Sequence, residues 1–133
     1  MTRPQRILIV ADEAQSESMR GPLEQRRYAV ESQSDFDAAH HRLTDSEFDL
    51  VVIDLADAPP GIEFIKQVRA RTKLTRTLLL VVVDWGTGGA TLALAQGADA
   101  YEPKPLETSR LLASVERLLG GRIALAQGAT GPE

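Results

Sequence analysis

Apolar residues along the chain gather in short continuous runs separated by polar, helix-compatible segments. Four runs are clear and a fifth is weaker. They are ILIV (7–10), YAV (28–30), LVVI (50–53), LLLVVV (78–83) and the shorter DAY (99–101). Apolar runs without alternation are typical of strands in a parallel sheet that is covered on both faces. The pattern therefore predicts five strands.

The segments between the runs predict helices. Residues 14–27 are helix-compatible, although Gly21 and Pro22 are expected to bend or delay that helix. Asp35 is placed to cap the next helix, and Gly120–Gly121 should stop the last one. Apolar residues at helical spacing are Ala38, Ala39 and Leu43, then Ile62, Ile65 and Val68, then Leu92 and Ala95, and finally Leu111, Leu112, Val115, Leu118 and Leu119. Five strand–helix alternations predict an α/β fold with right-handed crossovers and a doubly wound parallel sheet.

Length and composition narrow the class of protein. The 133 residues suit one domain, which we assign to residues 1–120, and the small-residue-rich stretch 121–133 is expected to be a flexible tail or linker. A net charge of −4 disfavours direct nucleic-acid binding. The absence of cysteine excludes disulfides, thiol catalysis and cysteine-ligated zinc. The first apolar run is too short for a signal peptide or membrane span, so we expect no membrane contact and a cytoplasmic location.

Charged residues follow three of the predicted strands. Asp12 and Glu13 come after the first, Asp54 after the third, and Lys104 after the fifth. The carboxyl ends of parallel strands form the ligand-binding edge of such a sheet. Carboxylates and backbone carbonyls are ligands for Mg²⁺, a lysine can hold phosphate oxygens, and an exposed carboxylate can accept a phosphoryl group. Simpler interpretations are that Asp54 only ends a strand, that the first two acids cap a helix, and that Lys104 is a solvated loop residue.

Four stretches carry a family resemblance. The segments RILIVADE, DLVVIDL, GIEFIKQVRA and QGADAYEPKPLETSRLLASVERLL, together spanning residues 5–120, resemble the receiver domains of two-component response regulators. The resemblance implies a flavodoxin-like (βα)5 fold with strand order 2-1-3-4-5, in a bacterial signalling protein.

The same resemblance implies roles for individual residues. Asp54 matches the phosphoacceptor, Asp12 the principal metal-binding acid, and Lys104 the phosphate contact, whose bond to the following proline would be cis. Ala56 would lend its backbone carbonyl to the metal. Tyr101 falls on the aromatic position that moves inward when the family switches.

The chain departs from the family pattern in three places. Ala11 stands where a first acid is usual, which leaves Glu13 as a further metal ligand beside Asp12. Val82 stands where a threonine or serine is usual, and valine has no hydroxyl to donate to a phosphoryl group. Losing one hydrogen bond to a charged group weakens the active state by about 1.5–3 kcal/mol. The loop after Asp54 also looks shorter than usual.

Two functional hypotheses follow. In the first, the protein is not an enzyme but a receiver that accepts a phosphoryl group on Asp54 from a histidine kinase or phosphotransfer protein with Mg²⁺, and its switching is weakened. In the second, it is a degenerate pseudo-receiver that serves as a phosphorylation-independent dimerisation or docking module. Either one can use a homodimer face made by the fourth helix, fifth strand and fifth helix. A flavodoxin-like enzyme or nucleotide binder is disfavoured because no catalytic histidine or serine is placed at a strand end and no phosphate loop follows the first strand.

Overall fold

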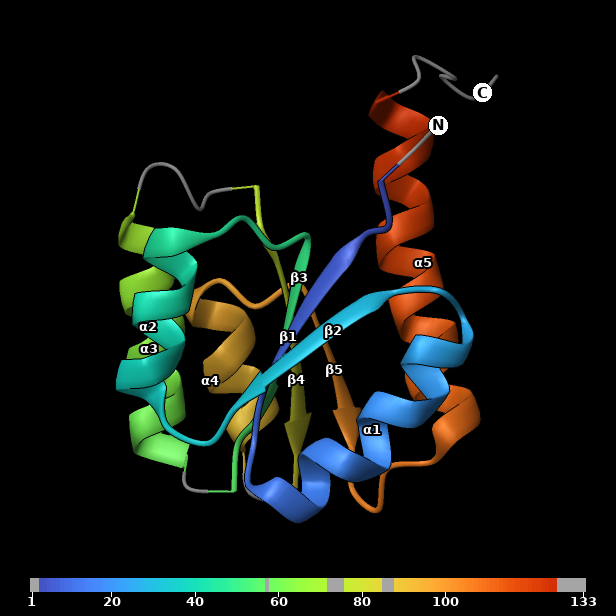
Figure 1. Ribbon diagram of the computed structural model, residues 1–133. Coiled ribbons are helices and arrows are strands. Elements are labelled where there is room, and N and C mark those ends of the chain that lie inside the picture. Colours follow the sequence, from blue (N-terminus) through green and yellow to red (C-terminus); the bar gives the residue numbers. More distant parts are fainter. Residues whose placement is uncertain (1–2, 57, 72–75, 85–87, 127–133) are drawn as a thin grey trace.

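The computed structural model describes residues 3–56, 58–71, 76–84 and 88–126. Its centre is a parallel sheet with strand order β2-β1-β3-β4-β5, and this order confirms the expected doubly wound topology (Figure 1). The strands are β1 (Arg6–Val10), β2 (Ala29–Gln33), β3 (Leu50–Asp54), β4 (Leu78–Val83) and β5 (Ala100–Pro103).

Helices cover both faces of the sheet. They are α1 (Glu13–Gln25), α2 (Phe36–Asp45), α3 (Ala58–Ala70), α4 (Gly89–Gln96) and α5 (Thr108–Ala126). Helices α2, α3 and α4 lie on one face, and α1 and α5 lie on the other (Figure 1). Asp35 caps α2 as expected, because its carboxylate accepts a 2.7 Å hydrogen bond from the Ala38 amide.

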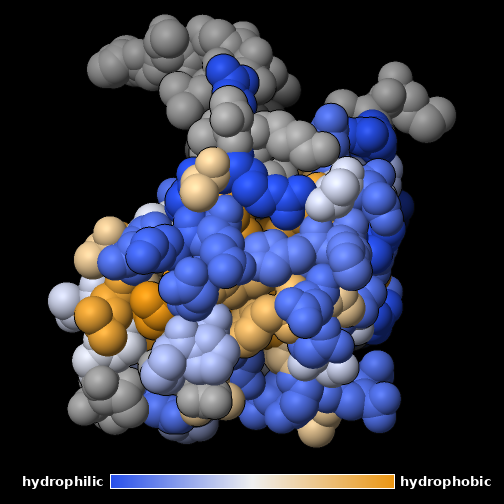
Figure 2. All heavy atoms as spheres, turned by 90° about the vertical axis from the view of Figure 1, so that its left-hand side faces the viewer, coloured by the Kyte–Doolittle hydropathy of each residue, from blue (hydrophilic) through white to orange (hydrophobic). Residues whose placement is uncertain are grey.

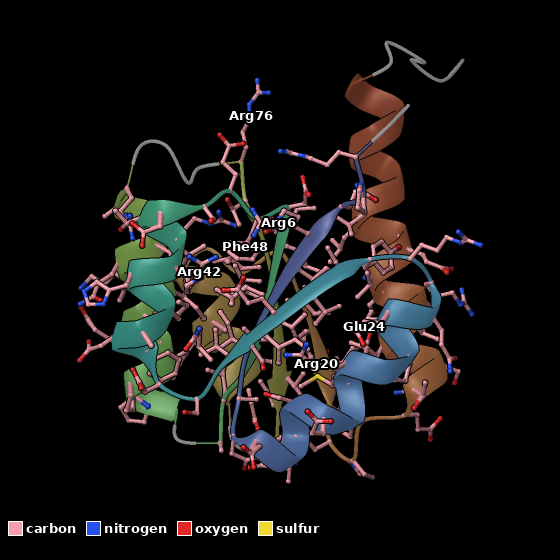
Figure 3. All side chains as sticks on the ribbon, in the orientation of Figure 1. Arg6, Arg20, Glu24, Arg42, Phe48 and Arg76 are labelled. Atoms are coloured by element: carbon pink, nitrogen blue, oxygen red, sulfur yellow. The ribbon has the colours of Figure 1, made fainter. Side chains whose placement is uncertain are left out.

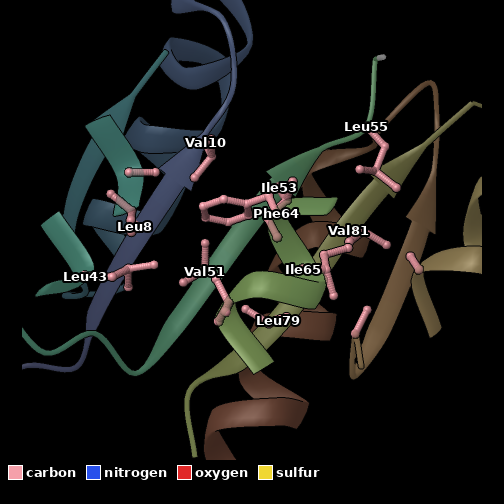
Figure 4. Close-up of a cluster of buried hydrophobic side chains, with 14 of the residues drawn as sticks. Leu8, Val10, Leu43, Val51, Ile53, Leu55, Phe64, Ile65, Leu79 and Val81 are labelled. Carbon is pink, nitrogen blue, oxygen red and sulfur yellow. The ribbon is translucent and has the colours of Figure 1, made fainter. Parts of the chain in front are cut away.

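Alternation along the strands divides the core into two clusters. Leu8, Val51 and Val81 point toward α2, α3 and α4, where Phe64 fills the centre of the cluster (Figure 4). Their strand neighbours contribute to the second cluster, against α1 and α5. Its buried members are Ile7, Ile9, Ala11, Met19, Leu23, Leu50, Val52, Leu80, Val82, Leu111, Val115 and Leu119. Both faces of β1, β3 and β4 are buried, which explains their unbroken apolar runs.

Two strands extend beyond their apolar runs. The sequence predicts the second strand at 28–30, but β2 pairs with β1 as far as the Val10–Gln33 register. The fifth strand likewise continues past residue 101, because β5 stays paired with β4 as far as Val83–Pro103. Backbone hydrogen bonding to a neighbour sets these ends, and it requires no apolar side chain.

Two helices differ from their predicted limits. Helix α1 begins at Glu13 and contains Pro22, so the Gly21–Pro22 pair does not delay it, and a bend at this pair stays a prediction; buried Met19 and Leu23 hold the helix on the sheet on either side of the proline. Helix α5 does not stop at Gly120–Gly121 but continues to Ala126. A glycine inside a helix costs only about 1 kcal/mol relative to alanine, and the preceding turns of α5 are already well packed. Residues 121–126 are therefore helical, and the domain boundary at 120 stays a prediction.

Candidate functional site

Asp54 and Lys104 form an ion pair at the carboxyl edge of the sheet. Asp54 is the last residue of β3, and its side chain is only 5% exposed. Lys104 follows β5 and places its Nζ 2.5 Å from Asp54 Oδ1. That oxygen is buried and, within the described residues, has no hydrogen bond of normal geometry, so the lysine charge is what compensates for its burial. Lys104 is therefore not a solvated loop residue.

The backbone positions Lys104 over the sheet edge. Its amide donates a 2.8 Å hydrogen bond to the Val83 carbonyl of β4. The Lys104–Pro105 peptide bond is cis, as the resemblance implied. The lysine side chain is directed toward Asp54 of β3.

Asp12 both caps a helix and borders a pocket. Its carboxylate accepts a 2.8 Å hydrogen bond from the Gln15 amide at the start of α1, which confirms the capping interpretation. Asp12 also shares a pocket of about 170 Å³ with Asp54 and Ala56. The remaining lining residues are Val10, Ala11, Ser34 and Phe36, and we call this the Asp54 pocket. The two acids and Ala56 thus line one pocket, and the role of the Ala56 carbonyl stays a prediction.

Glu13 lies elsewhere. It borders a second, more polar pocket of about 230 Å³, formed by Ala11, Glu13, Ser16, Glu17, Ser32, Gln33 and Ser34. Asp54 is not among the lining residues of this Glu13 pocket. The structure therefore separates the two adjacent acids, with Asp12 beside Asp54 and Glu13 on the side toward β2.

The Asp54 pocket offers a small set of metal ligands. Among the described residues, no group of three or more histidine, cysteine, aspartate or glutamate side chains is close enough to hold a metal ion. Mg²⁺, however, is usually held by one or two carboxylates and keeps several waters. The Asp12 and Asp54 carboxylates and Ala56, whose backbone carbonyl is the expected third ligand, line the same pocket, and this donor set fits a hydrated Mg²⁺ ion with few protein ligands.

Val82 lies directly beside Asp54. The two residues are register partners on β4 and β3, and the Leu55 amide donates a 2.9 Å hydrogen bond to the Val82 carbonyl. Val82 is 2% exposed and packs in the cluster under α1 and α5. The sheet position nearest to Asp54 on β4 therefore presents methyl groups and no hydroxyl.

Tyr101 faces away from this position. Its neighbours Ala100 and Glu102 lie toward α5, where Glu102 accepts a hydrogen bond from Ser114. Alternation along the strand puts Tyr101 on the opposite face of the sheet from Val82. The tyrosine is 40% exposed, so it lies outward in this structure.

Sequence reasoning missed Ser34 and Phe36 as pocket residues. Both follow the carboxyl end of β2, where pocket residues belong, but the apolar run predicted that this strand ends at residue 30 rather than 33. Trp85 follows the fourth apolar run and is, from the sequence, either a cover on apolar surface or a lid over the site. It lies outside the described residues.

This fold has the flavodoxin-like architecture, with an aspartate that lines a pocket beyond the strand ends and is ion-paired with a lysine. The family described as "Response regulator receiver domain" matches residues 7–116, and the chain belongs to it. It is thus a receiver domain of the two-component response regulators, whose receivers are signalling modules that interact with histidine kinases.

Curated relatives agree with this assignment. Protein PetR of Rhodobacter capsulatus is 35% identical over 87% of this chain and 49% of its own length. Response regulator MprA of Mycobacterium sp. is 34% identical over 87% of the chain and 51% of its own length. The chain spans about half the length of the curated relatives that it matches.

Solved structures share the fold. A putative response regulator from Chloroflexus aurantiacus matches with a TM-score of 0.82 and 23% identity, over 89% of this chain and 99% of its own. The chemotaxis response regulator CheY4 of Vibrio cholerae matches with a TM-score of 0.78 and 22% identity, over 88% and 99%. None of the described helices is long and apolar enough to cross a membrane.

Proposed function

We propose that Asp54 accepts a phosphoryl group from a histidine kinase or phosphotransfer protein, with Mg²⁺ in the Asp54 pocket and with weakened switching. The observation that carries this proposal is that Asp54 is ion-paired with Lys104 and also lines a pocket that contains a second carboxylate. A structural aspartate at a strand end needs neither the paired lysine nor the pocket.

Each residue has a defined part in the transfer. An Asp54 carboxylate oxygen attacks phosphorus, so that a P–O bond forms while the P–N bond to the donor histidine breaks and the electron pair returns to the imidazole. Lys104 then turns from the carboxylate to the phosphoryl oxygens, which carry more negative charge. Asp12 and the Ala56 carbonyl would hold Mg²⁺, which supplies charge neutralisation at the phosphoryl group when bound.

The alternative function, a docking or dimerisation module that does not depend on phosphorylation, also has support. The large apolar side chains with substantial exposure among the described residues are Leu92, Leu94 and Tyr101, all on α4 and β5. Residues 86–98 contain no charged side chain. On the side of the molecule shown in Figure 2, hydrophilic surface dominates and hydrophobic surface gathers toward one flank. An apolar patch of this kind suits a protein partner, for which a second copy of the chain is the simplest candidate.

The first experiment is intact mass spectrometry after incubation with acetyl phosphate and Mg²⁺. We expect a single phosphoryl adduct on the wild type and none on Asp54→Asn. No adduct on the wild type, under conditions that label a control receiver, would contradict phosphoacceptor chemistry and favour the docking module.

A second experiment separates output from chemistry. Leu92 and Leu94 are two residues apart on α4, so their side chains point about 200° apart and only one can lie toward β5. We expect Leu94→Lys or Leu92→Lys, but not both, to reduce self-association measured by sedimentation velocity. If the wild type is monomeric at every concentration and in both phosphorylation states, the homodimer proposal is wrong.

A further inference from the structure

Three polar side chains line the Asp54 pocket, and two of them already have an interaction partner. One carboxylate oxygen of Asp12 accepts the hydrogen bond that caps α1, and Asp54 is paired with Lys104. The third is Ser34, which is exposed and whose hydroxyl makes no hydrogen bond within the described part of the chain. A free hydroxyl at the wall of a polar pocket can both donate and accept hydrogen bonds.

Ser34 is held in place from both sides. The residue before it, Gln33, is the last of β2 and accepts a 3.1 Å hydrogen bond from the Ala11 amide at the end of β1. The residue after it, Asp35, caps α2 through its side chain. Phe36 fixes the first turn of α2 by stacking on Phe64, with ring centroids 4.9 Å apart. The hydroxyl is therefore carried by a short, anchored loop.

Ala11 leaves the space in front of Ser34 open. Both residues line the Asp54 pocket and the Glu13 pocket, so the two pockets meet along the line between them. Ala11 is 7% exposed, and its methyl group provides no polar contact there. A ligand that extends from Asp12 and Asp54 toward β2 meets Ser34 at the wall that the two pockets share.

We infer that Ser34 positions the hydrated divalent cation in the Asp54 pocket, by accepting a hydrogen bond from a water on Mg²⁺. This inference rests on the proposed Mg²⁺ site. Mg²⁺ dehydrates reluctantly, and two carboxylates and one carbonyl leave coordination positions for water. Groups that hydrogen-bond to metal-bound ligands affect metal affinity although they do not touch the metal. Ser34 is such a positioning residue, in a loop that sequence reasoning did not connect to the site.

The test is a Mg²⁺ titration of the full chain followed by ¹H–¹⁵N NMR, which needs no phosphorylation. We expect Ser34→Ala to weaken Mg²⁺ affinity about 3- to 10-fold, the worth of one hydrogen bond. Ser34→Thr, which keeps the hydroxyl, should stay within about 2-fold of the wild type on the same reasoning. The matched control is Ser18→Ala, an exposed serine on α1 that lines neither pocket.

Ala11→Asp supplies a second arm. A carboxylate at this position would accept the hydrogen bond from the metal-bound water in place of Ser34. Ala11→Asp should therefore tighten Mg²⁺ binding, and adding Ser34→Ala to Ala11→Asp should change the Mg²⁺ affinity little. If Ser34→Ala binds Mg²⁺ as tightly as the wild type, the inference is wrong even if Asp54 is phosphorylated. If the wild type binds no Mg²⁺, the metal site itself is wrong, whereas Ser34-dependent Mg²⁺ binding without a phosphoryl adduct contradicts only the proposed function.

Discussion

Asp54 and Val82 are lateral neighbours in the sheet, paired in register at the carboxyl ends of β3 and β4. Register partners in a parallel sheet direct their side chains to the same face, so the Val82 methyl groups lie next to the proposed phosphorylation site. The valine is nearly fully buried and anchors the cluster under α1 and α5. The position that could report the state of Asp54 to the core is therefore apolar.

Restoring a hydroxyl at this position should strengthen the phosphorylated state. In Val82→Thr, the hydroxyl would donate to an oxyanion bound at Asp54, and a hydrogen bond to a charged group is worth about 1.5–3 kcal/mol. We expect beryllofluoride, a phosphoryl mimic, to bind this variant at least about 10-fold more tightly in the presence of Mg²⁺. Fluorine NMR of bound beryllofluoride gives the affinity.

Val83→Thr is the matched control, because Val83 is also 2% exposed but belongs to the cluster on the opposite face. Both variants should lose about 1–3 kcal/mol of unfolding free energy from burying a hydroxyl. Equal beryllofluoride affinity in the two variants would contradict the role given to Val82.

The Asp54–Lys104 ion pair should contribute to stability through the charge it neutralises. Lys104→Met leaves a carboxylate whose side chain is 5% exposed without its cation, and we expect the unfolding free energy to fall by about 1–3 kcal/mol. Adding Asp54→Asn should return most of the loss, since the amide carries no charge. Urea unfolding of the two single variants and the double variant measures this coupling. Additive losses would mean that the pair contributes nothing.

The positions of the strands were predictable because the burial of a strand shows in its own sequence, whereas the strand order came from the family resemblance. Strands β1, β3 and β4 are buried on both faces, so their apolar runs coincide closely with the strands. The edge strand β2 is partly exposed and ends in Ser32 and Gln33, where no apolar signal exists. Its carboxyl end was therefore missed, and the pocket residues that follow it were missed too.

The candidate site was also predictable in part. Asp12, Asp54 and Lys104 follow strands with clear ends, and the sheet brings them together. The adjacency of Asp12 and Glu13 in the sequence does not tell which way each side chain points. Their separation into two pockets depends on which side of the start of α1 each one faces. The continuation of α5 through two glycines depends on packing of the earlier turns, which no glycine count reveals.

Glu31 should give the protein an acid-sensitive element away from the site. It accepts hydrogen bonds from Arg42 and lies 3.8 Å from Arg6, and both guanidinium groups stack on Phe48 (Figure 3). The hydrogen bond from Arg42 lowers the pKa of Glu31 below its ordinary value of 4.5, against the opposing effect of burial.

A lowered pKa in the folded state means that the folded protein binds fewer protons than the unfolded chain. The contribution is therefore complete above pH 4.5 and is lost as the pH falls below that value. We expect Glu31→Gln to lose about 0.5–1 kcal/mol of unfolding free energy at pH 7 and to converge on the wild type as the pH falls below the lowered pKa of Glu31. Glu24→Gln is the control, because that carboxylate is half exposed and 3.6 Å from Arg20. Parallel pH curves for wild type and Glu31→Gln would contradict the assignment.

Gly97, which lies between α4 and β5, should not tolerate a side chain. Its φ is 122°, and a Cβ built there would lie 2.5 Å from Arg69 Cγ. Arg69 cannot move aside cheaply, because it donates hydrogen bonds to the Gly97 and Thr77 carbonyls and to Asp99. We expect Gly97→Ala to lower the unfolding free energy by about 2–4 kcal/mol, combining backbone strain with the loss of part of this network.

The comparison with Gly88→Ala separates these two causes. Gly88 also has a positive φ, 77°, but nothing lies within 4 Å of its added Cβ, so its alanine variant should lose only about 1–2 kcal/mol. In an Arg69→Ala background the steric part of the Gly97→Ala cost disappears, and the two glycine variants should then differ much less. Chemical denaturation measures the unfolding free energy of the two glycine variants, of Arg69→Ala and of the two double variants. Equal losses for Gly88→Ala and Gly97→Ala in the wild-type background would show that Arg69 is not the obstacle.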